Sequence, residues 1–104
     1  MAAETGVRSL HAELTAATED TATLSGADKV GMRAELVHHG YLLDGTTAAT
    51  EPIYYRLDGT AAVAQADETE VLLSGERVSL QLPESGQVSL ISAGTPGYSL
   101  ILTD

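Results

Sequence analysis

The chain has no cysteine, phenylalanine, tryptophan or asparagine, and its only aromatic side chains are four tyrosines. The lack of cysteine excludes disulfides, thiolate metal sites and cysteine nucleophiles, and the lack of asparagine excludes N-glycosylation. A core must therefore be built from Leu, Val, Ile and Ala together with some of the tyrosines. At 104 residues the chain is long enough for one domain with a core of its own.

Basic residues are also scarce. Five Lys and Arg stand against fifteen Asp and Glu, which gives a formal net charge of −10. The basic residues are scattered singly along the chain: Arg8, Lys29, Arg33, Arg56 and Arg77. Proteins that bind nucleic acid or anionic membranes need clustered positive charge, so we expect neither as a partner.

Long apolar runs are missing as well. No segment approaches the ~20 apolar residues of a membrane-spanning helix, and the first residues, which include Glu4, lack the apolar run of a secretory signal. We therefore expect a soluble protein that consists of a single domain, residues 1–104. Residues 1–6 are a candidate flexible arm that could add to the sheet of another subunit.

The pattern that does occur is an alternation of apolar and polar residues with a period of two. It recurs in short segments rich in Val, Ile, Tyr and Thr, at residues 9–16, 21–25, 30–36, 53–57, 78–82, 87–92 and 98–102. Such segments, separated by Gly, Pro or Asp at spacings of roughly 8 to 12 residues, are typical of all-β sandwiches and barrels. Residues 7–19 also have some helical periodicity, so a helix is an alternative there. We predict an all-β antiparallel sandwich, immunoglobulin-like or jelly-roll-like, of about seven to eight strands.

Turns are predicted at Gly and Pro. Asp44-Gly45 and Asp58-Gly59 belong to two similar stretches, YLLDGTTAA and YYRLDGTAA, and Asp-Gly tolerates the positive φ of a tight turn. The segment LQLPESGQVSLIS predicts a hairpin that turns at residues 83–87. Pro52 lacks a backbone donor, which predicts that the strand after it begins at a sheet edge.

The same turns do not suggest a metal site. Each Leu-Asp-Gly-Thr copy has one carboxylate and lacks the alternating oxygen ligands of a calcium loop. His38 and His39 are adjacent, so on a strand they point to opposite faces, and His11 could join one of them only through the tertiary structure. We predict that these residues hold no metal.

Catalytic patterns are equally weak. Ser99 lies in GYSLI, which lacks the second Gly of a nucleophile elbow. Asp67, Glu68 and Glu70 form a carboxylate cluster, but the chain has few aromatic residues to line a sugar-binding cleft beside it. We predict a protein that is not an enzyme and has no cofactor.

Three segments follow one another in the order VHHG, EPIYYRLDGTAAVAQADETEVLLSGERVSLQLP and QVSLISAGTPGYSLI. This order, over residues 30–102, resembles small β-sandwich virion proteins of tailed bacteriophages. In those proteins a D-x-I-Y-x-R-x-D-G-like strand and turn precede an acidic loop, a strand pair and a closing V-x-L-I-S-x-G-T-x-x-Y-S-like hairpin.

The resemblance implies a virion structural protein of the capsid decoration, or cement, type. Such a protein would be made in the bacterial host cytoplasm, bind the major capsid protein or other virion subunits on the outer capsid surface, and form a homo-oligomer such as a trimer. A tail or head–tail component is the alternative within the virion. Outside the virion, the sequence is also compatible with a β-sandwich module that binds carbohydrate or a receptor, and with an inhibitor whose acidic surface covers a basic target.

Four residues are candidates for an interface with a partner: Tyr54, Arg56, Tyr41 and Tyr98. Tyr54 and Arg56 are predicted to lie on the strand face opposite Ile53, Tyr55 and Leu57. That face is where we expect a neighbouring subunit to bind.

Overall fold

The computed structural model describes residues 2–6, 8–24, 33–42, 44–57, 69–82 and 87–103. These residues form nine strands and no helix. The strands are β1 (Ala2–Gly6), β2 (Ser9–Glu13), β3 (Asp20–Leu24), β4 (Arg33–His38), β5 (Ile53–Arg56), β6 (Glu70–Leu72), β7 (Arg77–Gln81), β8 (Gln87–Ser92) and β9 (Gly97–Leu102). No helix long and apolar enough to span a membrane occurs in this described part of the chain.

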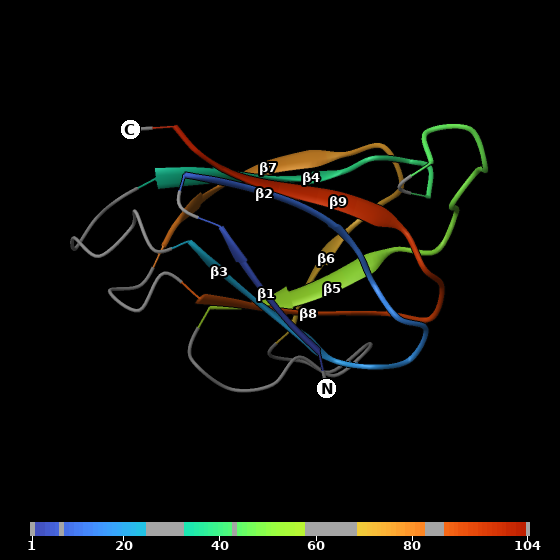
Figure 1. Cartoon of the computed structure of the whole chain (residues 1–104), viewed down its shortest axis with the longest axis horizontal. Coiled ribbons are helices and arrows are strands. Elements are labelled where there is room, and N and C mark those ends of the chain that lie inside the picture. The colour runs from blue at the N-terminus through green and yellow to red at the C-terminus, as the bar shows by residue number, and fades with distance from the viewer. Residues whose placement is uncertain are drawn as a thin grey trace.

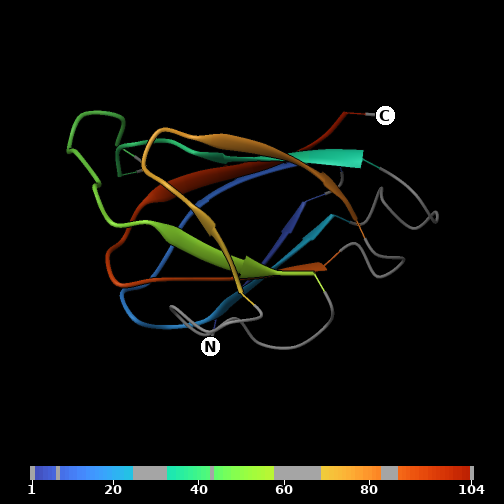
Figure 2. The same ribbon diagram turned by 180° about the vertical axis from the view of Figure 1, so that it is seen from behind.

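The strands form two sheets that pack face to face, as the views from opposite sides show (Figures 1 and 2). One sheet has the order β1-β3-β8-β5-β6 and the other the order β2-β9-β4-β7. Neighbouring strands are antiparallel except β1 and β3, which are parallel. The predicted all-β sandwich is confirmed. It has one strand more than the expected seven to eight. Two strands lie outside the segments identified from the sequence: β1, which pairs with β3 of the same chain, and β6, which pairs with β5.

The alternation read from the sequence places the core. In β2, β3, β4 and β5 every second side chain is buried, and the buried sets from the two sheets meet between the layers. Burying a Leu, Ile or Val side chain completely is worth about 1.5–3 kcal/mol. The helical alternative for residues 7–19 is wrong, because Ser9–Glu13 is a strand that pairs along its whole length with β9.

The connections differ from the sequence prediction. Among the described strands only β5 and β6 are both consecutive and neighbours in one sheet; the other consecutive pairs lie in different sheets. The predicted hairpin between residues 81 and 87 is therefore wrong, since β7 pairs with β4 whereas β8 pairs with β3 and β5. Gly and Pro indicate where a chain reverses. They do not indicate whether the next strand pairs with the last one or crosses to the opposite sheet.

The edge position predicted from Pro52 is also wrong. Pro52 lies just outside β5, and Ile53 pairs with Ser92 on one side and with Leu72 on the other. Because the missing backbone donor precedes the strand, β5 loses none of its interstrand hydrogen bonds. β5 is an inner strand of the five-stranded sheet.

Four connections gather at one end of the sandwich, at the right of Figure 1. We call this surface the loop end and define it as residues 14–19, 39–42, 44–52, 73–76 and 93–96. Backbone bonds tie the connections together, with Leu14 N donating to Pro96 O at 3.1 Å and Gly97 N to Tyr41 O at 2.8 Å.

Candidate functional site

Tyr54 and Arg56 lie where the sequence placed them. Ile53 and Tyr55 are buried, while Tyr54 and Arg56 are half-buried on the outer face of the five-stranded sheet. Tyr54 pairs with Ile91 on β8 and with Val71 on β6, whose side chain is 50 % exposed. This part of the outer face is therefore apolar, and Tyr54 is one of its members.

The other two predicted interface tyrosines have opposite environments. Tyr41 is 47 % exposed and forms an isolated β-bridge with Ala48 in the loop end. Tyr98 has an exposure of 0 % and belongs to the core, on β9 between β2 and β4. Tyr98 thus has no surface to offer a partner, although the sequence placed it with the interface residues. Its period-two relation to Leu100 and Leu102, which are also buried, already indicated an inner face.

The Asp44-Gly45 stretch is a turn, as predicted. Gly45 has a φ of 75°, and Asp44 Oδ1 accepts hydrogen bonds from Thr46 N at 2.8 Å and Thr47 N at 2.9 Å. The Thr47 hydroxyl donates to Asp44 Oδ2 at 2.8 Å. These donors, the two backbone amides first, lower the pKa of Asp44 from 3.8 to about 2. The second copy, Asp58-Gly59, lies outside the described residues.

His38 and His39 do point to opposite sides of β4. His38 is 1 % exposed, and its side chain forms hydrogen bonds to loop-end residues from their buried side. Its Nδ1 accepts a hydrogen bond from Gly40 N at 3.0 Å, so the proton is on Nε2, which donates to Glu51 O at 2.8 Å. A buried imidazole thus joins the beginning and the end of the β4–β5 connection.

His39 meets His11 on the outer face of the four-stranded sheet. Ser99 Oγ lies 2.6 Å from His11 Nδ1 and 2.6 Å from His39 Nε2. A hydroxyl has one proton, so with both rings neutral Ser99 donates to one of them and accepts from the other. Burial lowers the pKa of His39, and the charges of His11 and then His38 lower it further.

The sequence could not anticipate this cluster, because its members come from β2, β9 and the residue after β4. The cluster places two imidazoles next to the Ser99 hydroxyl, but it lacks the oxyanion donors of a nucleophilic site. An oxyanion needs free donors nearby, and the backbone around Ser99 is paired with β2 and β4 on both sides. Among the described residues no three or more of His, Cys, Asp and Glu gather in a way that could hold a metal ion.

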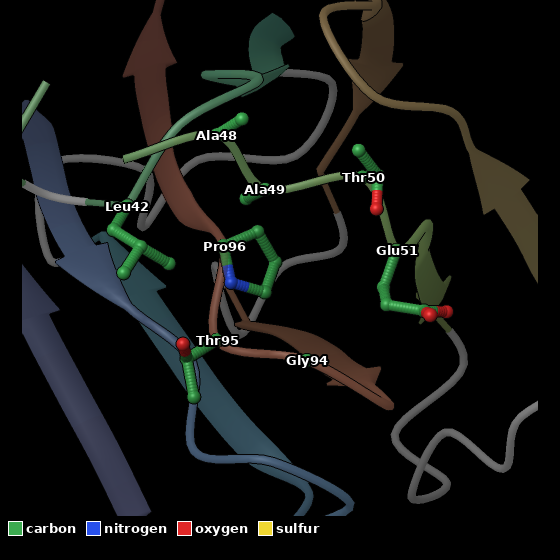
Figure 3. Close-up of a pocket in the computed structure, with 8 residues that line it drawn as sticks. All are labelled: Leu42, Ala48, Ala49, Thr50, Glu51, Gly94, Thr95 and Pro96. Carbon is green, nitrogen blue, oxygen red and sulfur yellow. The ribbon is translucent and has the colours of Figure 1, made fainter. Parts of the chain in front are cut away.

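A cavity of about 270 Å³ opens on the loop end between the β4–β5 and β8–β9 connections. It is lined by Leu42, Ala48, Ala49, Thr50, Glu51, Gly94, Thr95 and Pro96. In Figure 3 the side chains of Leu42 and Glu51 lie on either side of the Pro96 ring. The lining therefore combines apolar residues with the polar side chains of Thr50, Thr95 and Glu51.

The carboxylate cluster of the sequence is only partly visible. Asp67 and Glu68 lie outside the described residues, and Glu70 is an exposed residue at the start of β6. The feature that the sequence missed is the loop end itself. Its members are small or ordinary loop residues that come together only when four separate connections meet.

No protein-family model and no curated protein matches the sequence. Among solved structures the chain is similar to PliG of Aeromonas hydrophila, a periplasmic lysozyme inhibitor of g-type lysozyme. The two share 14 % sequence identity with a TM-score of 0.51, over 98 % of this chain and 97 % of that chain. At this identity the similarity is one of fold: the chain has a β-sandwich architecture comparable to that of PliG over nearly its whole length.

Proposed function

We propose that this chain is a non-enzymatic virion structural protein of a tailed bacteriophage, a capsid decoration protein that binds the outer surface of the shell and stabilises it. The motif order over residues 30–102 supports this proposal, as does a surface suited to binding protein. The observation that carries it is the position of the exposed large apolar side chains. Of the three exposed large apolar side chains among the described residues, Tyr41 (47 % exposed) and Leu73 (53 %) lie on the loop end, which also holds the cavity, and Val71 (50 %) lies on β6.

The charge supports a position outside the shell. With a formal net charge of −10, the protein would be repelled by packaged nucleic acid. On the outer surface this repulsion would not oppose binding, because the major capsid protein or another virion subunit supplies the contacts there. Decoration by a homo-oligomer, such as a trimer, belongs to the same proposal.

Co-sedimentation with assembled shells tests the proposal. Purified protein is mixed with expanded capsids that lack it, and the pelleted fraction is measured against protein concentration, while sedimentation equilibrium gives the oligomeric state. We expect saturable binding with a fixed ratio of copies to capsid subunits. A protein that stays monomeric and remains in the supernatant at every concentration would exclude the decoration role.

A second candidate function is inhibition of a basic enzyme. It is favoured by the similarity in fold to a lysozyme inhibitor over 98 % of the chain, together with the net charge of −10, because an acidic surface complements a basic target. The assay is the clearing of peptidoglycan by a g-type lysozyme with increasing amounts of this protein. A stoichiometric loss of lysozyme activity would favour this function over decoration.

A further inference from the structure

The loop end is a preformed surface. Ala49 N donates to Gly40 O at 3.0 Å, and the Ser74 hydroxyl donates to Ala49 O at 2.7 Å. From the inside, His38 Nε2 donates to Glu51 O. The walls of the cavity are thus fixed before any partner arrives, which lowers the entropic cost of binding.

The apolar surface extends beyond the cavity. Tyr41 is bridged to the cavity residue Ala48, and Leu73 precedes Ser74, which bonds to the cavity residue Ala49. Two exposed large apolar side chains therefore belong to segments that are bonded to cavity residues. At about 270 Å³ the hollow is slightly smaller than the roughly 300–1,000 Å³ of small-molecule sites, and it is large enough to admit an aliphatic side chain.

The charges around this surface have one sign. The loop end contains four acidic residues, Glu19, Asp44, Glu51 and Glu76, and no Lys or Arg. Glu51 lines the cavity itself. Two copies of this chain would bring these carboxylates against each other, whereas a basic segment would be attracted to them.

We infer that the loop end is the docking surface for a basic segment of a partner protein, which inserts one aliphatic side chain between Leu42, Ala49 and Pro96 and places its cationic side chains against the carboxylates. This inference rests on the proposed function, in that it assumes a protein partner, and it specifies the chemistry of that partner. The acidic rim speeds and orients the encounter, and the cavity selects the side chain.

A peptide titration followed by ¹⁵N–¹H correlation spectra tests the inference. The probe is acetyl-Lys-Arg-Leu-Arg-Lys-amide at low ionic strength, with two matched peptides in which Ser replaces Leu or Glu replaces every cationic residue. We expect the peptide to change the amide chemical shifts of residues 41–42, 48–51, 73–76 and 94–96 only. Replacing Leu by Ser should weaken binding by about tenfold or more, because several methylene contacts are lost. The acidic peptide should not bind.

Three variants locate the contact. Ala48→Leu enlarges one of the residues that line the cavity and should weaken binding of the Leu peptide. Glu51→Gln removes the carboxylate at the rim and should weaken binding about two- to fivefold, as for an exposed ion pair. Glu70→Gln removes one charge from β6, outside the loop end, and should bind like the wild type. Melting temperatures confirm that each variant is folded.

The results separate this inference from the proposed function. Shifts elsewhere on the molecule, equal binding of the Leu and Ser peptides, or loss of binding in Glu70→Gln but not in Ala48→Leu would overturn the docking surface. If the chemical shifts of loop-end residues change with protein concentration in the absence of peptide, the occupant is a second copy of this chain. That result would also overturn the inference. Shell binding that persists in Ala48→Leu and Glu51→Gln would contradict this surface and leave decoration intact.

Discussion

At the scale of single residues, the two kinds of polar site in this protein have different origins. Asp44 accepts hydrogen bonds from Thr46 N, Thr47 N and the Thr47 hydroxyl. All of its partners lie within three residues, so the sequence DGTT was enough to predict the turn. His11, Ser99 and His39 come from three places in the chain. The sequence therefore held no local signal for their contact.

The low pKa of Asp44 makes a prediction about pH. Its folded value of about 2 is below the ordinary 3.8, so folding favours the charged carboxylate. The resulting stability is complete above pH 3.8 and is lost as the pH falls through about 2. Asp44→Asn keeps one acceptor oxygen without the charge. We expect wild type to be more stable than this variant at pH 6, with a difference that shrinks between pH 3.8 and 2.

Urea unfolding of both proteins from pH 6 to pH 2 measures that difference in stability. The NMR chemical shift of the Asp44 carboxyl group, followed over the same pH range, gives its pKa directly. Comparison with the variant cancels the titration of the other acidic groups. A difference that stays constant over the whole range, or a pKa of Asp44 near 3.8, would show that the hydrogen bonds of the turn do not hold in solution.

At the scale of elements, periodicity predicted the faces of strands but not their neighbours. In β5 the inner positions Ile53 and Tyr55 and the outer positions Tyr54 and Arg56 agree with the alternation. The partners of β5 are β8 and β6, and no pattern within residues 53–56 specifies them. Pairing depends on residues far away in the sequence, which is why the predicted hairpin and the predicted edge strand were both wrong.

Two adjacent tyrosines test the faces of β5. Tyr55 is 6 % exposed, and replacing a buried aromatic residue by Ala costs about 3–5 kcal/mol. Tyr54 lies on the outer face, where truncation is expected to cost about 1 kcal/mol or less. Urea unfolding of Tyr55→Ala and Tyr54→Ala compares them directly. Equal losses of stability would mean that the ring of Tyr54 is buried in solution, for example against another subunit.

At the scale of the whole molecule, the excess of negative charge acts over the full width of the sandwich. The molecule measures 35 × 28 × 22 Å, and the Debye length falls from roughly 30 Å at 0.01 M salt to 3 Å at 1 M. At low salt the acidic groups therefore repel one another across the whole fold. The same repulsion opposes self-association through the acidic loop end.

We expect the thermal midpoint to rise with NaCl at pH 7, because screening relieves this repulsion more in the compact state than in the unfolded chain. A gain of about 1 kcal/mol corresponds to about 4–8 °C for a domain of this size. Differential scanning calorimetry at pH 7 measures the effect. The control is the same salt series at the sequence pI of about 4.4, where the dependence should largely vanish. A thermal midpoint at pH 7 that does not change with NaCl concentration would contradict the expectation.

The sequence by itself determined the class of fold, the inner and outer faces of most strands and the turn at Asp44-Gly45. These features depend on interactions between residues at most a few positions apart, or on the simple separation of apolar from polar side chains. The tertiary structure alone decided the rest. It joined His11 to His39 through Ser99, sent successive strands to opposite sheets, and brought four connections together at the loop end, two of which line the cavity. Each of these depends on which strands pair across long stretches of chain, and such pairing leaves no mark in a local pattern.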